Sequence, residues 1–200
     1  QQAREAHLTE VLDTHGNKVV VTYATETKGI ADCGNPSYVR AIRPSRIEYI
    51  PKQVVGNESL ATVGVDFGYA LRDDSGVPGK TDPYVQNFWS DWRLSVITVQ
   101  VRSSASVFST VRSYELNPAG AEYVWKDQAA GQGLLVLKTI RQKGKDGGAL
   151  PDWTFTYTTI NGWLNHTVLA SAGNGQGGSA VYSYVNLSNV WMEGCGDWSS

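Results

Sequence analysis

Residues 173–185 read "GNGQGGSAVYSYV", and their glycines fall in the spacing G-x-G-x-x-G at Gly173, Gly175 and Gly178. In a dinucleotide-binding loop this spacing joins a strand to a helix, whose N-terminus meets the pyrophosphate of the cofactor. The residues that follow here, "SAVYSYVN" at 179–186, alternate with the two-residue period of a strand. We therefore predict a tight turn between two strands, with glycines at positive φ, and we expect no nicotinamide cofactor.

The same two-residue period recurs along the chain in segments rich in β-branched and aromatic side chains. These segments are 17–24, 45–50, 61–72, 92–101, 108–116, 134–142, 152–160, 164–171 and 179–186. Clusters of Gly, Pro, Asn and Asp separate them, as expected of turns. The sequence therefore predicts an all-β fold built from antiparallel hairpins.

Residues 3–12, "AREAHLTEVL", are the one stretch whose composition favours a helix. Its apolar residues fit either the helical or the strand period. Because 13–17, "DTHGN", has the composition of a hairpin turn, we expect 6–12 to form a strand.

Composition limits the classes of function. The chain has 200 residues, of which 41% are hydrophobic, and a formal net charge of −2. It has no basic stripe that would bind nucleic acid, no run of about 18 apolar residues that would span a membrane, and no apolar signal-peptide core near residue 1. We expect a single β segment over 1–200 that is part of a larger chain, with a tail of unassigned structure at 187–200.

Several predicted strands end on an aromatic residue in the pattern apolar-x-Tyr/Phe. The residues are Tyr23, Tyr49, Phe67, Tyr69, Tyr114, Phe155, Tyr157, Tyr182 and Tyr184. Their spacing is irregular, so the chain is not a strict solenoid, but the pattern indicates one hairpin unit used repeatedly. Cross-strand packing of the rings would stabilise neighbouring hairpins.

Longer motifs surround these aromatic residues. Residues 8–23, "LTEVLDTHGNKVVVTY", hold a D-x-x-G-N turn between two strands, and residues 43–49 read "RPSRIEY". Residues 63–74 read "VGVDFGYALRDD", 92–116 hold "WRLSVITVQV" and "TVRSYEL", and 134–157 contain "KGKDGGALPDWTFTY". Together with 164–186, these six segments resemble, in the same order, the hairpins of the Rhs/YD-repeat family.

The resemblance implies a strip of the long antiparallel sheet that curves and spirals into a hollow shell in this family of toxin-complex and teneurin-like proteins. In bacterial members the shell encloses a C-terminal toxin, and in animal relatives it serves adhesion. The implied role is structural, non-enzymatic, and secreted or at the cell surface. The implied partners are flanking β-structure of the parent chain, other copies edge to edge, or an enclosed polypeptide cargo.

The chain also departs from the family pattern. It lacks the R-Y-Y/D repeat run and the D-P-x-G-type self-cleavage core, and two of its segments, "YVWKDQAAGQG" and "VWMEGCGDWSS", have no counterpart. These residues therefore do not support a toxic cargo.

We find no catalytic, cofactor-binding or metal-binding motif in the sequence. The histidines, His7, His15 and His166, lack a second ligand at metal-binding spacing. Four acids on or beside predicted strands could pair across a sheet as glycosidase acids, although solvent-facing carboxylates are the simpler interpretation. They are Glu48, Asp66, Glu115 and Asp152.

Seven tryptophans raise an alternative function, a carbohydrate-binding β-sandwich. In the polar segment "NFWSDW", Trp89 and Trp92 could form a platform on which a glycan stacks. Core packing is the commoner role of tryptophan in a β protein, and we favour it here.

Two further features would matter in an exported protein. Cys33 and Cys195 are the only cysteines, and either a disulfide between them or two free thiols fits their loop-like surroundings. Asn57, Asn165 and Asn186 lie in N-x-S/T sequons, which are used only in a host that glycosylates.

The ends of the predicted sheet carry little protection against further pairing. The terminal strands would be 8–12 with 18–23 at one end and 179–186 at the other. They contain no Pro and a single Lys, although lysine and proline commonly blunt exposed edges. We therefore expect the sheet to continue into neighbouring β-structure.

Overall fold

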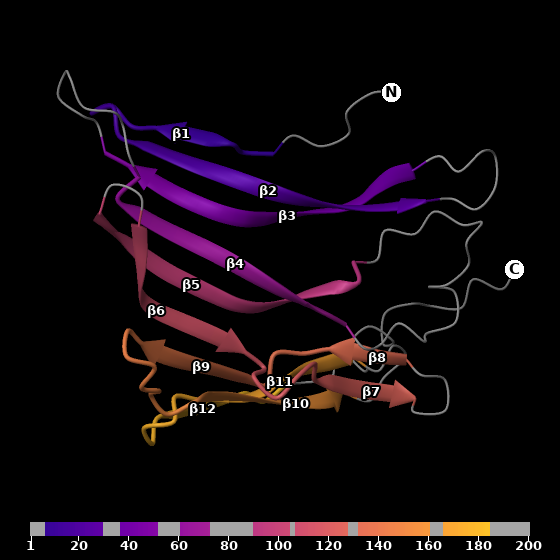
Figure 1. Cartoon of the computed structure of the whole chain (residues 1–200). Helices are drawn as coiled ribbons and strands as arrows, with labels where there is room; N and C mark the ends of the chain where they lie inside the picture. Colours follow the sequence, from indigo (N-terminus) through magenta and orange to yellow (C-terminus); the bar gives the residue numbers. More distant parts are fainter. Residues whose placement is uncertain are drawn as a thin grey trace, which may run out of the picture.

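The computed structural model describes residues 7–29, 37–51, 61–72, 90–104, 107–127, 132–160 and 166–184. All regular structure in this part of the chain is β-strand (Figure 1). The strands are β1 (Glu10–Leu12), β2 (Lys18–Gly29), β3 (Ser37–Ile50), β4 (Val63–Leu71), β5 (Trp92–Ser104), β6 (Val107–Leu116), β7 (Tyr123–Asp127), β8 (Gln132–Leu135), β9 (Thr139–Gly144), β10 (Trp153–Ile160), β11 (His166–Gly173) and β12 (Ser179–Val181).

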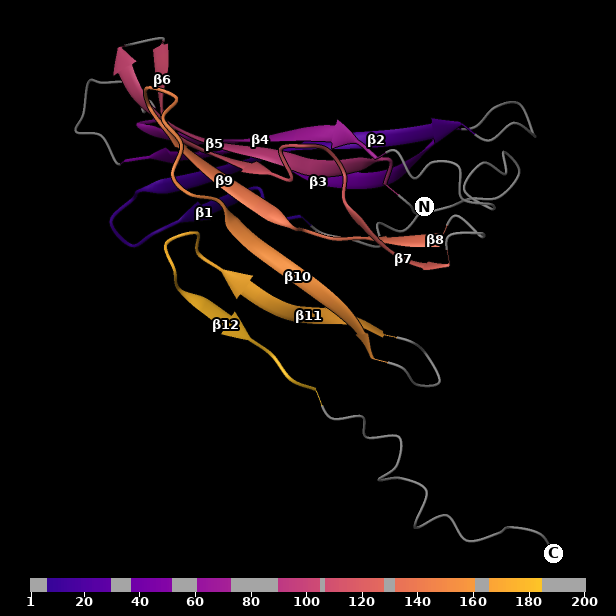
Figure 2. The ribbon, with the colours of Figure 1, turned by 90° about the horizontal axis from the view of Figure 1, so that it is seen from below.

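Ten of these strands form one antiparallel sheet in the order β1-β2-β3-β4-β5-β6-β9-β10-β11-β12, and β7 pairs with β8 in a separate hairpin. The prediction of an all-β antiparallel fold is therefore confirmed. The strands β10–β12 are turned away from the direction of β2–β5 (Figure 2), as the right-handed twist of strands requires over many strands. Within the described sheet, β1 and β12 are the two edge strands.

The register makes the central sheet amphipathic, because residues paired across antiparallel strands point to the same face. A polar row crosses six strands through Thr22, Arg46, Asp66, Thr98, Ser113 and Lys143. An apolar row on the other face crosses four strands through Val21, Ile47, Val65 and Val99. The alternation seen in the sequence thus separates charged from apolar side chains on the two faces of the sheet.

The apolar face is only partly covered. Among the described residues the buried hydrophobic side chains are Ala61 and Val136, and none of the described side chains is fully buried. Tyr49, which is paired with Val19 on the same face of the sheet, remains 42% exposed. The described residues therefore supply one layer of a β structure, whereas stable domains bury such a face against a second layer.

The prediction of one strand over 134–142 was wrong. The chain there divides into β8 and β9, which belong to different sheets. Asn117, which is buried and adopts a φ of 48°, donates from Nδ2 to Val136 O at 2.8 Å. Its Oδ1 accepts hydrogen bonds from the main-chain nitrogens of Lys138 and Thr139. The Asn117 side chain therefore bonds main-chain groups that a neighbouring strand would otherwise bond. The ladder of main-chain hydrogen bonds is interrupted at 136–138 for this reason.

Two other elements differ from the expected boundaries. The strand predicted at 45–50 begins earlier, at Ser37, and passes through Pro44, which lies next to a shift in register between β2 and β3. Proline is tolerated in a strand at such an irregularity because a ladder hydrogen bond is already missing. The β7–β8 hairpin falls in the segment that had no counterpart in the resemblance.

The turn at 172–178 joins β11 to β12, as predicted, and two of its four glycines adopt positive φ values, 69° at Gly175 and 91° at Gly177. Residues 10–12 of the predicted N-terminal strand form β1 and pair with β2. Both ends of the described sheet therefore consist of a short-turn hairpin.

These two hairpins, the first hairpin (8–23) and the last hairpin (169–184), share one hydrogen-bond pattern. In the first, Asp13 Oδ1 accepts from the main-chain nitrogens of His15 and Asn17, both at 2.8 Å. In the last, Asn174 Oδ1 accepts from those of Gln176 and Gly178, both at 2.9 Å. The hairpins are closed by Tyr23 Oη, which donates to Leu8 O at 2.8 Å, and by Tyr184 Oη, which donates to Leu169 O at 2.7 Å.

Two of the other strand-end tyrosines bond in the same way, Tyr69 to Pro44 O and Tyr157 to Leu137 O. In these four cases the tyrosine at the end of a strand donates its hydroxyl to a main-chain carbonyl outside its own strand. We call this hydrogen bond a tyrosine clasp. The ring of Tyr23 also packs on His7, with 5.3 Å between the ring centroids.

Candidate functional site

Of the predicted site residues, Trp92 lies in the described part of the chain, at the start of β5. The guanidinium carbon of Arg43 lies 5.0 Å from the centroid of its ring and 4.9 Å from that of Tyr69. Arg43 therefore occupies one face of the indole through a cation–π contact. Trp89, Cys33, Cys195, Asn57, Asn165 and Asn186 lie outside the described residues, as does the tail at 187–200.

A charged cluster beside Arg43 joins β2, β3 and the residues before β5. Glu26 and Arg40 are both buried and form an ion pair, and Arg40 also bonds Asp91. Glu26 further accepts from Ser90 Oγ at 2.9 Å and from the main-chain nitrogen of Asp91 at 3.1 Å. The Glu26 carboxylate thus ties the start of β5 to β2.

The electrostatics of this cluster favour the charged forms. Burial raises the pKa of Glu26, but hydrogen bonds from Arg40, Asp91 and Ser90 outweigh it and leave that pKa below its usual value. Burial likewise lowers the pKa of Arg40, and its bonds to Asp91 and Glu26 reverse that shift. A carboxylate held ionised by a guanidinium is a poor proton donor at neutral pH, so the geometry indicates a structural ion pair.

The four acids considered as glycosidase candidates each contact a cation. Arg46 reaches Glu48 at 2.8 Å and Asp66 at 2.5 Å, and it has room to cross β4 because Gly64 has no side chain. Lys143 bonds Glu115 at 2.5 Å. Arg141 binds both carboxylate oxygens of Asp152, at 2.9 and 2.8 Å, which lowers the pKa of Asp152. These contacts form ion pairs along the polar face of the sheet. Glu48 and Asp66 share the guanidinium of Arg46, whereas Glu115 and Asp152 each contact a separate cation.

The described residues contain no group of three or more His, Cys, Asp or Glu side chains that could hold a metal ion. His15 lies in the turn of the first hairpin, and its main-chain nitrogen bonds Asp13.

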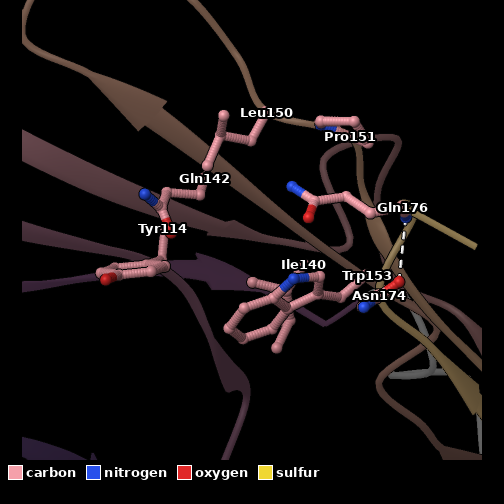
Figure 3. Close-up of a pocket in the computed structure, with 8 residues that line it drawn as sticks. All are labelled: Tyr114, Ile140, Gln142, Leu150, Pro151, Trp153, Asn174 and Gln176. Carbon is pink, nitrogen blue, oxygen red and sulfur yellow. Dashed lines mark hydrogen bonds between the residues drawn. The ribbon is translucent and has the colours of Figure 1, made fainter. Parts of the chain in front are cut away.

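A pocket of about 280 Å³ opens where β6, β9 and β10 meet the turn of the last hairpin. Its lining consists of Tyr114, Ile140, Gln142, Leu150, Pro151, Trp153, Asn174 and Gln176. In Figure 3 the Trp153 indole lies beside Ile140, the Tyr114 ring lies on the other side of the view, and the Gln176 side chain extends above the indole toward Gln142.

The register of three strands places these side chains on one face. Tyr114 is paired with Gln142, and Ile140 with Trp153, so the four side chains point to the same side of the sheet. That side continues the apolar face, since Tyr114 is also paired with Ile97. The pocket is therefore a hollow in the apolar face with carboxamides at its rim.

Gly175 brings the turn of the last hairpin to this pocket. A Cβ at Gly175 would lie 2.5 Å from Asp152 O and 2.7 Å from Pro151 Cβ, so the turn packs directly on the chain that enters β10. Asn174 and Gln176 stand on either side of this contact and reach the pocket from it. Gly175 is therefore required for two reasons: its positive φ, and the close approach of the turn to residues 151 and 152.

The sequence alone did not indicate this pocket. Trp153 was one of seven tryptophans, and Tyr114 is far from it along the chain. The one available signal was the reading of 172–178 as a tight turn, but the surface on which that turn packs depends on the order of the strands.

Comparison with protein-family models and with curated proteins finds no match. In the part of the chain that the structure describes, no helix is long and apolar enough to cross a membrane.

Proposed function

We propose that this chain is a structural segment of a larger β-sheet shell or scaffold, of the kind found in Rhs/YD-repeat proteins, and that it is secreted or displayed at a cell surface. In this proposal the ten-stranded sheet is one strip of a longer, curved sheet. The chain itself carries no catalytic role and takes part by pairing with neighbouring β-structure.

The observation that carries the proposal is the equivalence of the first and last hairpins. The edge strand β12 corresponds to β2, and the other side of β2 is paired with β3. The edge strand β1 corresponds to β11, and the other side of β11 is paired with β10. Each edge of the described sheet is therefore covered by an antiparallel strand in the equivalent hairpin. The hairpin unit is built for pairing on both sides.

The main-chain hydrogen bonds identify the groups that this pairing would use. Tyr182 N bonds Ala170 O, and Asn174 N bonds Gly178 O, so the N–H groups of Ser179 and Val181 point away from β11. At the other edge Val21 N bonds Thr9 O, and by the same alternation the N–H group of Glu10 points away from β2. A strand that continued the sheet would bond these outward groups.

The partly covered apolar face supports the same proposal. A sheet with one charged face and one apolar face gains stability when the apolar face is buried, at roughly 25 cal/mol per Å². In a hollow shell built from a long sheet, further turns of the sheet and enclosed chain supply that cover. A cargo polypeptide is the partner that such an enclosed face would contact.

The alternative, a carbohydrate-binding sandwich with a platform at Trp89 and Trp92, has less support. The described strands form one ten-stranded sheet and a separate hairpin, and Arg43 covers a face of Trp92.

Hydrogen exchange on the protein in its natural assembly tests the proposal. We expect the amides of Ser179, Val181 and Glu10 to be protected at least about 100-fold more than turn amides such as that of Lys145, because strand pairing buries them. Equal, fast exchange at the edge and turn amides would show that the sheet ends at β1 and β12.

A pair of variants isolates the contribution of the edge. Val181→Pro removes an outward N–H and should weaken association at this edge, whereas Val181→Ala keeps that N–H and should leave association unchanged. The measurement is light scattering of the assembly against protein concentration. Identical behaviour of the two variants would contradict pairing through β12.

A further inference from the structure

We propose that the pocket between Tyr114 and Trp153 binds an uncharged saccharide, with one sugar ring against Trp153 and its hydroxyls bonded by Gln142 and Gln176. This site is distinct from the platform considered at Trp89 and Trp92. It is tested on the chain by itself, in which the apolar face of the sheet is open, so the test does not depend on the scaffold role.

The aromatic part of the pocket suits the apolar face of a sugar ring. Trp153 keeps 43% of its surface exposed although Ile140 packs beside it, so the indole is held and still accessible. Pyranose rings present C–H groups on one face and hydroxyls around the edge. A supported, half-exposed indole offers a flat surface to the C–H face, and Tyr114 stands across the opening.

The polar part of the pocket suits the hydroxyls. Within the part of the chain that the structure describes, no hydrogen bond occupies the side-chain amides of Gln142 and Gln176, whereas Asn174 Oδ1 is used by the turn. Each carboxamide offers two N–H donors and an acceptor oxygen, and each sugar hydroxyl is both a donor and an acceptor. Gln142 and Gln176 lie on different sides of the Trp153 indole, so their amides can bond hydroxyls along the edge of a sugar ring that packs on the indole.

The charges of the region lie elsewhere. Arg141 comes between Ile140 and Gln142, so it points to the opposite face, where it binds Asp152. The lining itself contains no ionisable acid or base, apart from the Tyr114 phenol. Arg112 donates to that phenol at 3.3 Å, so a guanidinium lies at the rim beyond Tyr114. Because the lining offers apolar surface and carboxamides but no charged partner, it favours an uncharged ligand over a charged one.

A proline-rich peptide is the main competitor for a groove with exposed aromatic rings. Such a peptide has carbonyl acceptors but few N–H donors, so it would leave the acceptor oxygens of Gln142 and Gln176 without partners. The donor and acceptor balance therefore favours the saccharide.

The site is preorganised by the turn of the last hairpin. Gly175 packs on Pro151 and Asp152, which fixes the main chain from which the Gln176 side chain extends. A turn whose main chain is already ordered in the free protein loses less freedom when a ligand binds.

The test uses the whole chain and three probes: cellohexaose, maltohexaose and N-acetylchitohexaose. NMR titration follows the indole N–H signal of Trp153, which Trp153→Phe assigns. A single ring of about twelve heavy atoms predicts a Kd of about 1 mM for at least one probe. The double change Gln142→Ala with Gln176→Ala should weaken that binding tenfold or more, since about two hydrogen bonds are lost.

Matched arms keep the proposal falsifiable. Thr158→Ala, an exposed change on β10 away from the pocket, should leave binding unchanged. Failure of all three probes at 10 times the expected Kd, or equal binding by the double variant, would overturn the site. Tighter binding of decaproline or of an oligogalacturonate than of any neutral probe would overturn the ligand class.

Discussion

The first and last hairpins have the same plan at opposite edges of one sheet, although their turns, "DTHGN" at 13–17 and "NGQGG" at 174–178, have only one residue in common, the glycine at Gly16 and Gly177. Both are capped by an Asx side chain, both place a glycine at positive φ, with 86° at Gly16 and 91° at Gly177, and both are clasped by a tyrosine hydroxyl. Where the first hairpin has Thr14, the last has Gly175, at a φ of 69° and against Pro151. The cap, the positive-φ glycine and the tyrosine form both hairpins, and Gly175 attaches the last hairpin to the rest of the sheet.

That difference separates local from tertiary roles within one motif. The cap, the positive-φ glycine and the clasp satisfy hydrogen bonds within 16 consecutive residues, so each hairpin is specified by its own sequence. Gly175 contributes little to the hairpin but allows two segments of backbone to approach closely. Substitutions at paired positions of the two hairpins can therefore test each role.

The largest effect is expected from Gly175→Ala compared with Thr14→Ala. Alanine at Gly175 must adopt a left-handed φ and overlaps the Asp152 and Pro151 backbone, which together cost about 3 kcal/mol of unfolding free energy. Thr14→Ala should change it by less than about 0.5 kcal/mol, as at other surface sites. Urea denaturation measures both, and equal midpoints would contradict the packed role of Gly175.

A smaller and equal effect is expected from Tyr23→Phe and Tyr184→Phe. Each removes one hydroxyl-to-carbonyl hydrogen bond, worth about 1 kcal/mol, and leaves the ring in place. Hydrogen exchange of the Val21 and Tyr182 amides, which lie at equivalent positions, reports the opening of each hairpin. If only one of the two variants opened its hairpin, the clasp would not be a shared element.

The smallest effect is expected on acidification, and it should distinguish the two caps. Hydrogen bonding by Asn17 lowers the pKa of Asp13, with further bonds from the main chain. A carboxyl whose pKa is lower in the folded state stabilises above its unfolded pKa, and that contribution is lost as the pH falls through the folded value, below about pH 4. The neutral cap Asn174 has no such dependence.

Amide exchange between pH 5 and pH 2, corrected for intrinsic rates, measures this contrast. The amides of His15 and Asn17 should lose protection, while those of Gln176 and Gly178 should keep theirs. Asp13→Asn is the matched control, because it gives the first hairpin the cap of the last. Parallel loss of protection in both hairpins would mean that the carboxylate of Asp13 is not responsible.

The sequence alone was sufficient for the elements whose determinants are local. The glycines of 173–178 and the alternation that follows them predicted a strand-to-strand turn, the alternation predicted most strands, and the turn at 13–17 predicted strand rather than helix at β1. Turn chemistry and a two-residue period act over a few residues, so they can be read without knowing the neighbours.

The alternation gave a wrong prediction where a side chain from another segment bonds the main chain. The period of 134–142 continues through residues 136–138, but Asn117 bonds those residues and divides the segment between two sheets. Nothing in the alternation reveals an acceptor supplied from outside the segment.

The pocket and the charged cluster depended on tertiary structure altogether. Tyr114, Trp153 and Gln176 come from separate hairpins, and the pairing of Arg40 with Glu26 and Asp91 joins three segments of the chain. Strand order and register decide such meetings, because a shift of one residue would turn every side chain of a strand to the opposite face. Local sequence determined the hairpins of this protein, and the stacking of those hairpins into one sheet decided which side chains meet.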